Sequence, residues 1–393
     1  MQDFFSADTL AFIAAHQNDD VAKLALKFSS RKDIDIRAAL QQIEGRQIAK
    51  SKLPSFANAE NIVYPVKLSM EQCSSEKTAL YKQSVAGDGA SMIDLTSGFG
   101  IDFYFISRHF KKAEYVERNA DLCRIASHNF KSLGATNVSA TNADGIELIK
   151  ASTSHYDLIF LDPARRDKNG KKTVEIKDCE PDVAALKDML LSKCDRMMLK
   201  LSPMLDIKSA LRDLDCVEEV HVVAVDNECK ELLFVCKKEA AFKRIVATNI
   251  KPDGKTEMLE STSASPTGCS LYSAPLSYLY EPNVAILKAN ISDCLASEKV
   301  KKVAPFSHLF TSDELYEDFP GRKFKLEKIF SMNKKELKEN LDGIKRANIT
   351  CRNFPLQADE LRKKLGIKEG GDKYIIATTD ENGNHLLTIC QKL

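Results

Sequence analysis

Between residues 91 and 238, short apolar runs alternate with amphipathic helical patterns. This alternation predicts an α/β fold in which parallel strands form one wound sheet covered by helices. Residues 226–231 are too few for a crossover helix between the last two runs, so the last strand should be antiparallel to its predecessor. The expected strands span residues 92–95, 114–117, 137–141, 157–161, 196–201, 221–225 and 232–237.

The regions on either side of this alternation have other patterns. Residues 1–80 carry apolar side chains such as Ile43 and Ile48 at near-helical spacing, which predicts an N-terminal helical region. The later elements expected are a strand, a helix and a closing hairpin, at residues 242–248, 284–295, 373–378 and 385–390. The chain is thus divided into the helical region, a sheet domain, a connector with a small α/β module and a basic module, at residues 1–80, 81–240, 241–320 and 321–393.

Composition narrows the class of protein. Of the 393 residues 44% are hydrophobic and 29% charged, which is typical of a globular chain. No apolar run approaches the roughly 18 residues that span a bilayer, and the first residues lack a secretory signal pattern. The eleven cysteines are scattered without a Cys-x-x-Cys spacing, which is typical of reduced thiols. We therefore expect a cytoplasmic protein without a metal site, a disulfide framework or a membrane segment.

A glycine-rich loop follows the first expected strand and carries the first candidate chemistry. The segment reads Asp94-x-Thr96-x-Gly98-x-Gly100-x-Asp102. Glycines allow a backbone to approach a ligand closely, and ligands of wound sheets bind at the carboxyl ends of the strands. A tight strand-to-helix turn without a ligand is the alternative interpretation of this loop alone.

Acidic residues at three later strand ends strengthen the ligand interpretation. Glu117 closes the second strand, about twenty residues after the loop, where a carboxylate can accept both hydrogen bonds of a ribose diol. Asp144 follows the third strand and is suited to receive an adenine amino group, and Asp162 ends the fourth. With Asp94, four carboxylates stand at four successive strand ends, which indicates a nucleoside-containing ligand.

These motifs resemble those of class I S-adenosylmethionine-dependent methyltransferases. The resemblance rests on the glycine loop, on Glu117 and Asp144, on Asp162-Pro163, and on the terminal hairpin of the sheet. It implies a Rossmann-like seven-stranded sheet whose loop cradles the methionine part of the cofactor, with the ribose at Glu117 and the adenine beside Asp144. The implied cofactor-binding residues are Ser75, Asp94, Thr96, Gly98, Gly100, Asp102, Glu117, Asp144 and Asp162.

Two further resemblances concern the substrate. The segment from Ser74 to Ala79 is similar to the pre-strand helix of RNA guanine-N2 methyltransferases of the cap type. The Asp-Pro-Ala-Arg-Arg segment at 162–166, Lys-Leu-Ser-Pro at 200–203 and the C-terminal region resemble a bacterial family of methyltransferases with a THUMP-like domain. This closer resemblance spans nearly the whole chain and implies small C-terminal α+β modules, ferredoxin-like or THUMP-like.

The segment after the fourth strand indicates the type of methyl transfer. Amino-group methyltransferases use Asp/Asn-Pro-Pro-Tyr/Phe, and here Asp162 and Pro163 fit while Ala164 and Arg165 replace the second proline and the aromatic. Arg165 or Arg166 would then grip a phosphate or stack on a base, although an ion-paired loop is the alternative. The candidate catalytic residues are Asp162, Pro163, Arg165 and Arg166.

A serine excludes one related reaction. Uracil-C5 RNA methyltransferases carry a similar Asp-Pro-Pro-Arg segment but need a cysteine nucleophile after the fifth strand. This chain has Ser202 there, and a serine hydroxyl is a poor nucleophile at neutral pH. Methylation of nitrogen or oxygen is therefore expected rather than C5 methylation.

Positive charge is concentrated near the C-terminus. Residues 321–370 contain fourteen Lys and Arg against seven Asp and Glu, so the rest of the chain is acidic although the total is only +1. Phenylalanines such as Phe324, Phe330 and Phe354 are interleaved with these charges. The module predicts a clamp for structured RNA, tRNA or rRNA, and the alternative is a solvated face over a phenylalanine core.

The leading hypothesis is an RNA methyltransferase. Two alternatives stay open at this point: methylation of a protein or small molecule, and a non-catalytic protein that binds S-adenosylmethionine and RNA. The sequence leaves the oligomeric state open.

Overall fold

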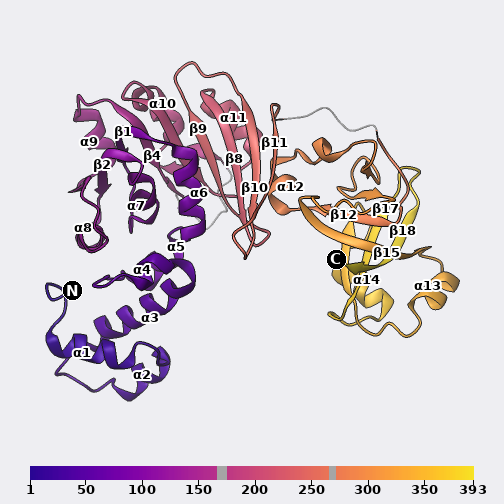
Figure 1. Cartoon of the computed structure of the whole chain (residues 1–393), viewed down its shortest axis with the longest axis horizontal. Coiled ribbons are helices and arrows are strands. Elements are labelled where there is room, and N and C mark those ends of the chain that lie inside the picture. Colours follow the sequence, from indigo (N-terminus) through magenta and orange to yellow (C-terminus); the bar gives the residue numbers. More distant parts are fainter. Residues whose placement is uncertain (166–174, 265–270) are drawn as a thin grey trace. The chain divides into compact units, whose positions relative to one another are not determined.

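The structure is a computed structural model of the chain and describes residues 1–165, 175–264 and 271–393 (Figure 1). The described residues form two compact units. The first unit comprises Met1–Glu218 and Leu232–Ala241, and the second comprises Glu219–Glu231 and Phe242–Leu393. Within these described ranges, no helix combines the length and the hydropathy that a membrane crossing requires.

The N-terminal region is helical, as its hydrophobic pattern predicts. Its first three helices begin at side-chain caps, because Ser6, Asp20 and Asp35 each accept a hydrogen bond from a backbone N–H in the following turn. Phe12 and Ile43 belong to the small core that these helices enclose. The helices are α1 (Ala7–His16), α2 (Val21–Lys27), α3 (Ile36–Lys52), α4 (Pro54–Asn58), α5 (Lys67–Gln72) and α6 (Glu76–Ala86).

A large sheet follows, and among the described residues it has nine strands in the order β11-β10-β8-β9-β7-β4-β1-β2-β3. β3, β2, β1, β4 and β7 pair in parallel, and β9 is antiparallel to β7. β8 and β9 are neighbours in this order with only residues 226–227 between them, as expected for the hairpin that the short connection predicts. The strands are β1 (Gly89–Asp94), β2 (Phe110–Glu117), β3 (Val138–Asn142), β4 (Tyr156–Leu161), β7 (Cys194–Leu201), β8 (Val217–Val225), β9 (Glu228–Cys236), β10 (Arg244–Ile250) and β11 (Thr256–Ser261).

The strands expected from the sequence are all present, but the expected total of seven is too low. β10 pairs in parallel with β8, and β11 pairs antiparallel with β10. The apolar run at 242–248 correctly predicts a strand there, yet no local pattern shows which edge it joins. Pairing with β8 extends the sheet beyond the terminal hairpin.

The first unit also contains connecting helices and a small ladder, whereas β10, β11 and most of β8 fall within the residues of the second unit. β5 (Ala164–Arg165) and β6 (Cys179–Glu180) pair antiparallel in a two-stranded ladder just after β4. The 3-10 turn η1 (Ile176–Asp178) precedes β6. The helices are α7 (Ile101–Ser107), α8 (Ala120–Ser132), α9 (Gly145–Ala151), α10 (Val183–Leu191) and α11 (Ile207–Leu214).

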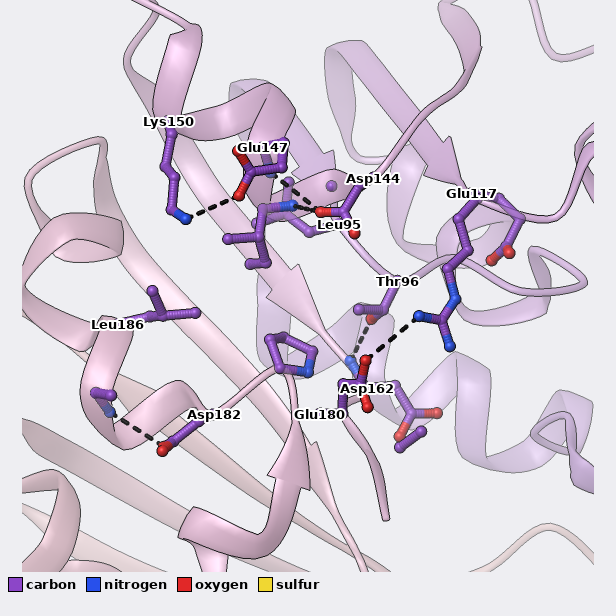
Figure 2. A pocket seen from close by; sticks show the side chains of 16 residues that line it. Leu95, Thr96, Glu117, Asp144, Glu147, Lys150, Asp162, Glu180, Asp182 and Leu186 are labelled. Atoms are coloured by element: carbon purple, nitrogen blue, oxygen red, sulfur yellow. Dashed lines mark hydrogen bonds and ion pairs between the residues drawn. The ribbon is translucent and has the colours of Figure 1, made fainter. Parts of the chain in front are cut away.

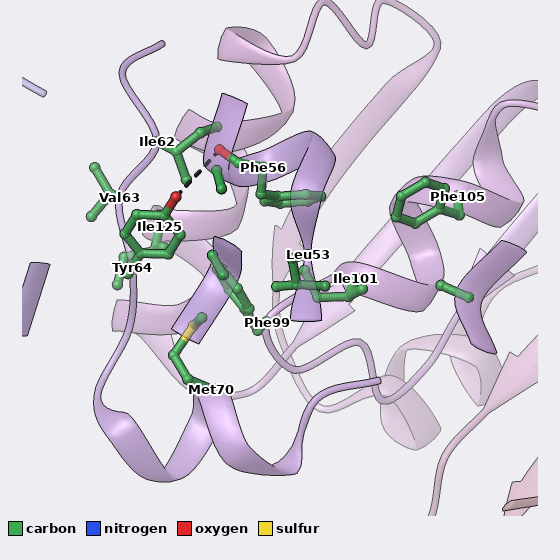
Figure 3. Close-up of a cluster of buried hydrophobic side chains, with 13 residues drawn as sticks. Leu53, Phe56, Ile62, Val63, Tyr64, Met70, Phe99, Ile101, Phe105 and Ile125 are labelled. Carbon is green, nitrogen blue, oxygen red and sulfur yellow. Dashed lines mark hydrogen bonds between the residues drawn. The ribbon is translucent and has the colours of Figure 1, made fainter. Parts of the chain in front are cut away.

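A buried cluster ties the N-terminal helices to the glycine loop (Figure 3). Phe56 and Met70 of the helical region pack with Phe99 and Ile101 of the glycine loop, whose side chains are buried in this core. Burying such side chains contributes about 1.5–3 kcal/mol each. The loop is therefore held through its apolar side chains, while Gly98 presents its backbone to open space.

The second unit contains a second sheet, which in its described residues has the order β13-β14-β12-β15-β18-β17-β16. β17 and β18 form the expected closing hairpin, and β16 pairs in parallel with β17. The strands are β12 (Tyr278–Pro282), β13 (Lys301–Lys302), β14 (Phe310–Ser312), β15 (Gly321–Ser331), β16 (Asn348–Arg352), β17 (Lys373–Thr379) and β18 (His385–Lys392). Its helices are α12 (Val284–Ala289), η2 (Ser292–Leu295), α13 (Lys334–Leu341) and α14 (Ala358–Leu365).

The single helix expected at 284–295 is wrong. Asn290 has a left-handed backbone with φ of 56° and ends α12, and the chain continues as the separate turn η2. Asparagine tolerates this conformation better than most residues, so it interrupts a run that otherwise reads as helical.

Candidate active site

The strand order brings four predicted acids to one edge of the first sheet. Because β3, β2, β1 and β4 are neighbours in that order, Asp144, Glu117, Asp94 and Asp162 stand at or just after successive carboxyl ends. Two cavities open along this edge, of about 510 and 240 Å³. Both are lined by Thr96, Asp162 and Ala164, so the two cavities meet at Asp162.

The larger cavity, called the edge cavity, lies over β1, β2 and β3 (Figure 2). Glu117 accepts hydrogen bonds from Gly98 N–H at 2.8 Å and from Asn119 N–H at 2.7 Å, one on each carboxylate oxygen. Each oxygen keeps acceptor capacity for a ligand, since a carboxylate offers about four lone-pair sites. Ile146 and Leu186 line the same cavity and supply apolar surface.

Asp144 has a structural task besides its predicted one. It is the N-cap of α9, and its Oδ1 accepts hydrogen bonds from Ile146 N–H at 2.9 Å and Glu147 N–H at 3.1 Å. These bonds fix the carboxylate on the edge cavity and leave Oδ2 available (Figure 2). Capping therefore positions the group that the sequence assigned to the adenine.

The smaller cavity, called the glycine-loop cavity, is lined by the loop itself from Thr96 to Asp102. Gly98 and Gly100 have φ of 54° and 84°, in the left-handed region that favours glycine. A Cβ on Gly100 would lie 2.7 Å from Phe130 Cζ, whereas a Cβ on Gly98 would meet nothing within 4 Å. Gly100 is needed for packing, and Gly98 leaves the ligand side of the loop open.

Two buried acids of this cavity have pKa values shifted in opposite directions. Burial raises the pKa of Asp94 well above its ordinary value of 3.8, and the Asp102 and Asp162 carboxylates raise it further, against a hydrogen bond from Thr96 N–H. Burial also acts to raise the pKa of Asp102, but Lys82 and Lys200 outweigh it and lower that pKa below 3.8. Asp102 is therefore the firmly ionised acid of the pair.

A line of alternating charges joins α6 to the end of β4. Lys82 Nζ lies 3.2 Å from Asp102 Oδ1, and Lys200 Nζ lies 3.6 Å from Asp102 Oδ2 and 2.5 Å from Asp162 Oδ2. Ser74 Oγ donates to Asp102 Oδ2 at 2.7 Å. The Lys82 side chain is fully buried, so its charge requires the Asp102 carboxylate.

Sequence reasoning missed both lysines as site residues. Lys200 stands at the carboxyl end of an otherwise apolar strand, Met197-Met198-Leu199-Lys200-Leu201, and a cation in such a run is a usable signal. Lys82 offers a weaker one, since it shares the buried face of α6 with Ala79 and Ala86.

In the segment before β1, the two adjacent serines Ser74 and Ser75 have different positions relative to the cavities. Ser75 is the N-cap of α6 and accepts a hydrogen bond from Thr78 N–H at 3.3 Å. Of the two adjacent serines, both within the described chain, Ser74 lines the glycine-loop cavity and Ser75 lines neither cavity. The sequence allowed α6 to begin at either serine. Because Ser75 is the N-cap, Ser74 is the serine whose hydroxyl contacts Asp102.

The segment after β4 is described in part. Asp162 N–H donates to Thr96 Oγ1 at 2.7 Å, which ties the motif to the glycine loop (Figure 2). Pro163 is buried and Ala164 lines both cavities. The backbone of Arg165 pairs with Cys179 in the β5–β6 ladder, and Arg166 lies outside the described residues.

In the second unit the charges and the phenylalanines of the basic segment separate. Phe324 and Phe330 are buried, as the alternative of a charged face over a phenylalanine core expects for them. Arg322 and Arg352 both pair with the buried carboxylate of Glu281. The remaining cations include exposed lysines on α13 and α14 and beside them, among them Lys334, Lys335, Lys338, Lys345, Lys363, Lys364 and Lys368.

Three family models match successive parts of the chain. Residues 76–179 match the family called conserved hypothetical protein 95, residues 278–320 a ferredoxin-like domain and residues 321–392 a THUMP domain-like family. The first match covers the strands that carry the two cavities, and the other two divide the second sheet.

Two relatives place the chain further. It is 32% identical to a "putative methyltransferase" from Porphyromonas gingivalis W83, whose crystal structure superposes with a TM-score of 0.85 over 99% of both chains. It is also 29% identical over 135 residues to an uncharacterized RNA methyltransferase of Mycoplasma mobile. That match covers 33% of this chain and 37% of the length of the Mycoplasma protein.

Proposed function

The chain belongs to the methyltransferase family represented by the Porphyromonas gingivalis protein. We propose that it uses S-adenosylmethionine to methylate a nitrogen atom of tRNA or rRNA. The observation that carries this proposal is the meeting of two cavities at Asp162. A glycine loop lines one cavity and the two further strand-end acids line the other. A cofactor with a nucleoside end and an amino-acid end fits such a pair of cavities, with its reactive centre between them.

The donor set of the edge cavity suits adenosine. Glu117 has acceptor capacity for the ribose hydroxyls, and Asp144 Oδ2 is available to an adenine amino group. Ile146 and Leu186 offer apolar contact to the base. The glycine-loop cavity, with Thr96 and Gly98 at its wall, then holds the methionine part.

S-adenosylmethionine supplies an electrophilic methyl group for in-line attack, so the protein mainly has to position the nucleophile. Asp162 stands where the cavities meet, and its carboxylate can accept a hydrogen bond from a target amine. Ser202, in place of the cysteine of C5 enzymes, argues against a C5 target, and the acceptor at Asp162 favours nitrogen among the remaining atoms. We assign Pro163 to shaping the approach, and Arg165 and Arg166 to binding near the target.

The choice of RNA rests on the second unit. Its exposed lysines lie in the part of the chain that matches the THUMP domain-like family, and the Mycoplasma relative is described as an RNA methyltransferase. An excess of seven positive charges over residues 321–370 provides sequence-independent attraction to phosphates. Because Phe324 and Phe330 are buried, the proposed clamp acts through its positive charges on the RNA backbone.

Mass spectrometry of nucleosides tests the proposal. RNA from a deletion strain should lack one methylated nucleoside that wild-type RNA contains, and a plasmid copy should restore it. A copy carrying Asp162→Ala should not restore it. An unchanged profile, together with S-adenosylmethionine binding by calorimetry, would contradict RNA as substrate and favour a protein or small-molecule substrate, or a non-catalytic role.

A further inference from the structure

The charges that line the glycine-loop cavity are unequal in number. Asp102 and Asp162 contribute two carboxylates beside the buried Asp94, and Lys200 is the one cation among the described residues that line it. Any ligand with a carboxylate and an ammonium at one end therefore meets several acids but a single lysine. The lysine decides whether the carboxylate is accepted.

Lys200 is shared unevenly between two acids. Its ammonium lies 2.5 Å from Asp162 Oδ2 and 3.6 Å from Asp102 Oδ2, and its side chain is 14% exposed. Of these two acids, Asp162 is the nearer. At such depth a charge pair is screened weakly, so exchanging one carboxylate for another costs less than losing the pair.

Neither acid depends on Lys200 alone. Asp102 also has the buried ammonium of Lys82 at 3.2 Å and the hydroxyl of Ser74 at 2.7 Å. Asp162 is 41% exposed, so water or a target amine can replace the lysine. Lys200 can thus leave Asp162 for another carboxylate without stranding a buried charge.

We infer that Lys200 binds the carboxylate of the amino-acid end of the cofactor, in exchange for Asp162. This assignment rests on the proposed function, because it takes S-adenosylmethionine as the ligand. The exchange makes Lys200 the residue that selects for an intact amino-acid end. It also frees Asp162 for the target amine only when the cofactor is in place.

Calorimetry with two ligands tests the exchange without any RNA substrate. S-adenosylhomocysteine carries the amino-acid end, and 5′-methylthioadenosine has the same thioether and adenosine without it. Lys200→Met should weaken the binding of S-adenosylhomocysteine about tenfold or more and leave the affinity for methylthioadenosine unchanged. Lys200→Arg, which keeps the charge, should restore most of the lost affinity.

Asp162→Asn gives the more distinctive result. It removes the competing carboxylate, so S-adenosylhomocysteine should bind a few-fold more tightly, again with methylthioadenosine unchanged. A lysine that only stabilises the fold would not produce this gain. Because Asp162 is partly exposed, this variant carries the test even if Lys200→Met fails to fold.

Lys187 provides a matched control. Its side chain is 15% exposed and its ammonium pairs with Asp215 and with the carbonyl of Leu214, yet it lines neither cavity. Lys187→Met should leave both affinities unchanged.

Three outcomes are decisive. Equal weakening of both ligands by Lys200→Met, or no weakening of S-adenosylhomocysteine, overturns the assignment. An unchanged or weakened S-adenosylhomocysteine affinity in Asp162→Asn overturns the exchange. Failure of the wild-type protein to bind either ligand contradicts the proposed function instead.

Discussion

The carboxyl edge of the first sheet and the basic segment of the second unit use charge in opposite ways. At the edge, Lys82 and Asp102 are buried and Lys200 is partly buried, and the three charges alternate in sign at distances of 3.2 and 3.6 Å. In the basic segment most of the positive charges are lysines at exposed positions, such as Lys334 and Lys363, and positive charges outnumber negative ones by fourteen to seven. The first arrangement specifies positions within a site, and the second attracts a polyanion without specifying where it binds.

This difference predicts which substitutions should strongly affect stability or binding. Where charges are buried, removing one partner leaves the other uncompensated, and the cost falls on a single residue. Where they are exposed, each contributes little and salt screens it, so only several together matter.

Asp102→Asn should destabilise the protein by about 3–5 kcal/mol at neutral pH, because it removes the carboxylate that lies 3.2 Å from the fully buried Lys82 ammonium and 3.6 Å from that of Lys200. The pKa of Asp102 is lowered in the folded protein, so its contribution is present above pH 4, roughly its unfolded pKa, and is lost as the pH falls through the folded value. Urea unfolding at several pH values should therefore show the gap between variant and wild type narrowing in acid.

Asp94→Asn is the matched variant, and its effect on stability should depend on pH in the opposite direction. The pKa of Asp94 is raised, so the folded protein favours its protonated form, and that contribution is lost as the pH rises through the raised value. Its stability relative to wild type should increase from about pH 4 to pH 7. A parallel pH dependence in the two variants would contradict the contrast between these acids.

Gly100→Ala should cost about 2–4 kcal/mol and weaken cofactor binding. Left-handed backbone strain adds to overpacking, since the new Cβ would lie 2.7 Å from Phe130 Cζ. Gly134→Ala is the control, because Gly134 also has positive φ, of 73°, but open space where the Cβ would stand. Thermal unfolding should show the smaller loss for Gly134→Ala, about 1 kcal/mol, and equal losses would show that the loop is not tightly packed.

Glu281→Gln tests a buried charge in the second unit, where most of the lysines of the basic segment are exposed. Its carboxylate is 3% exposed and pairs with Arg322 and Arg352, which are each about a third exposed. Because water can reach both guanidinium groups, we expect a loss of about 2 kcal/mol, less than for Asp102. Chemical unfolding of the full chain measures it, and a loss as large as that of Asp102→Asn would contradict the role given to exposure.

Reversal of Lys334, Lys335, Lys363 and Lys364 to glutamate should weaken binding of bulk RNA about tenfold or more at ~0.1 M salt and flatten its salt dependence, with stability changed by less than about 0.5 kcal/mol per site. Filter binding over a salt series measures both. The control reverses four exposed lysines of the first unit, Lys23, Lys27, Lys111 and Lys112. Equal weakening by the two sets would show that the basic segment has no special role.

Much of the first sheet follows from the sequence alone. Apolar runs and short turns are local signals, and the parallel rule places strand ends on one edge, so Asp94, Glu117, Asp144 and Asp162 were expected together. The short segment 226–231 likewise required an antiparallel β9. The glycine loop was identified for the same reason, since its residues are adjacent in the chain.

Only the tertiary structure decided which groups are buried together. Lys82 and Lys200 lie far apart in sequence and meet Asp102 because α6, α7 and β7 converge, which no local period encodes. The choice of Ser74 over Ser75 at this site depends on where α6 begins, by a single residue. The positions of β10 and β11 in the sheet likewise depend on long-range pairing, of β10 with β8 and of β11 with β10. Local pattern thus determined the elements and their chemistry, and long-range packing determined the charge partners, because burial and ion pairing depend on neighbours distant in the chain.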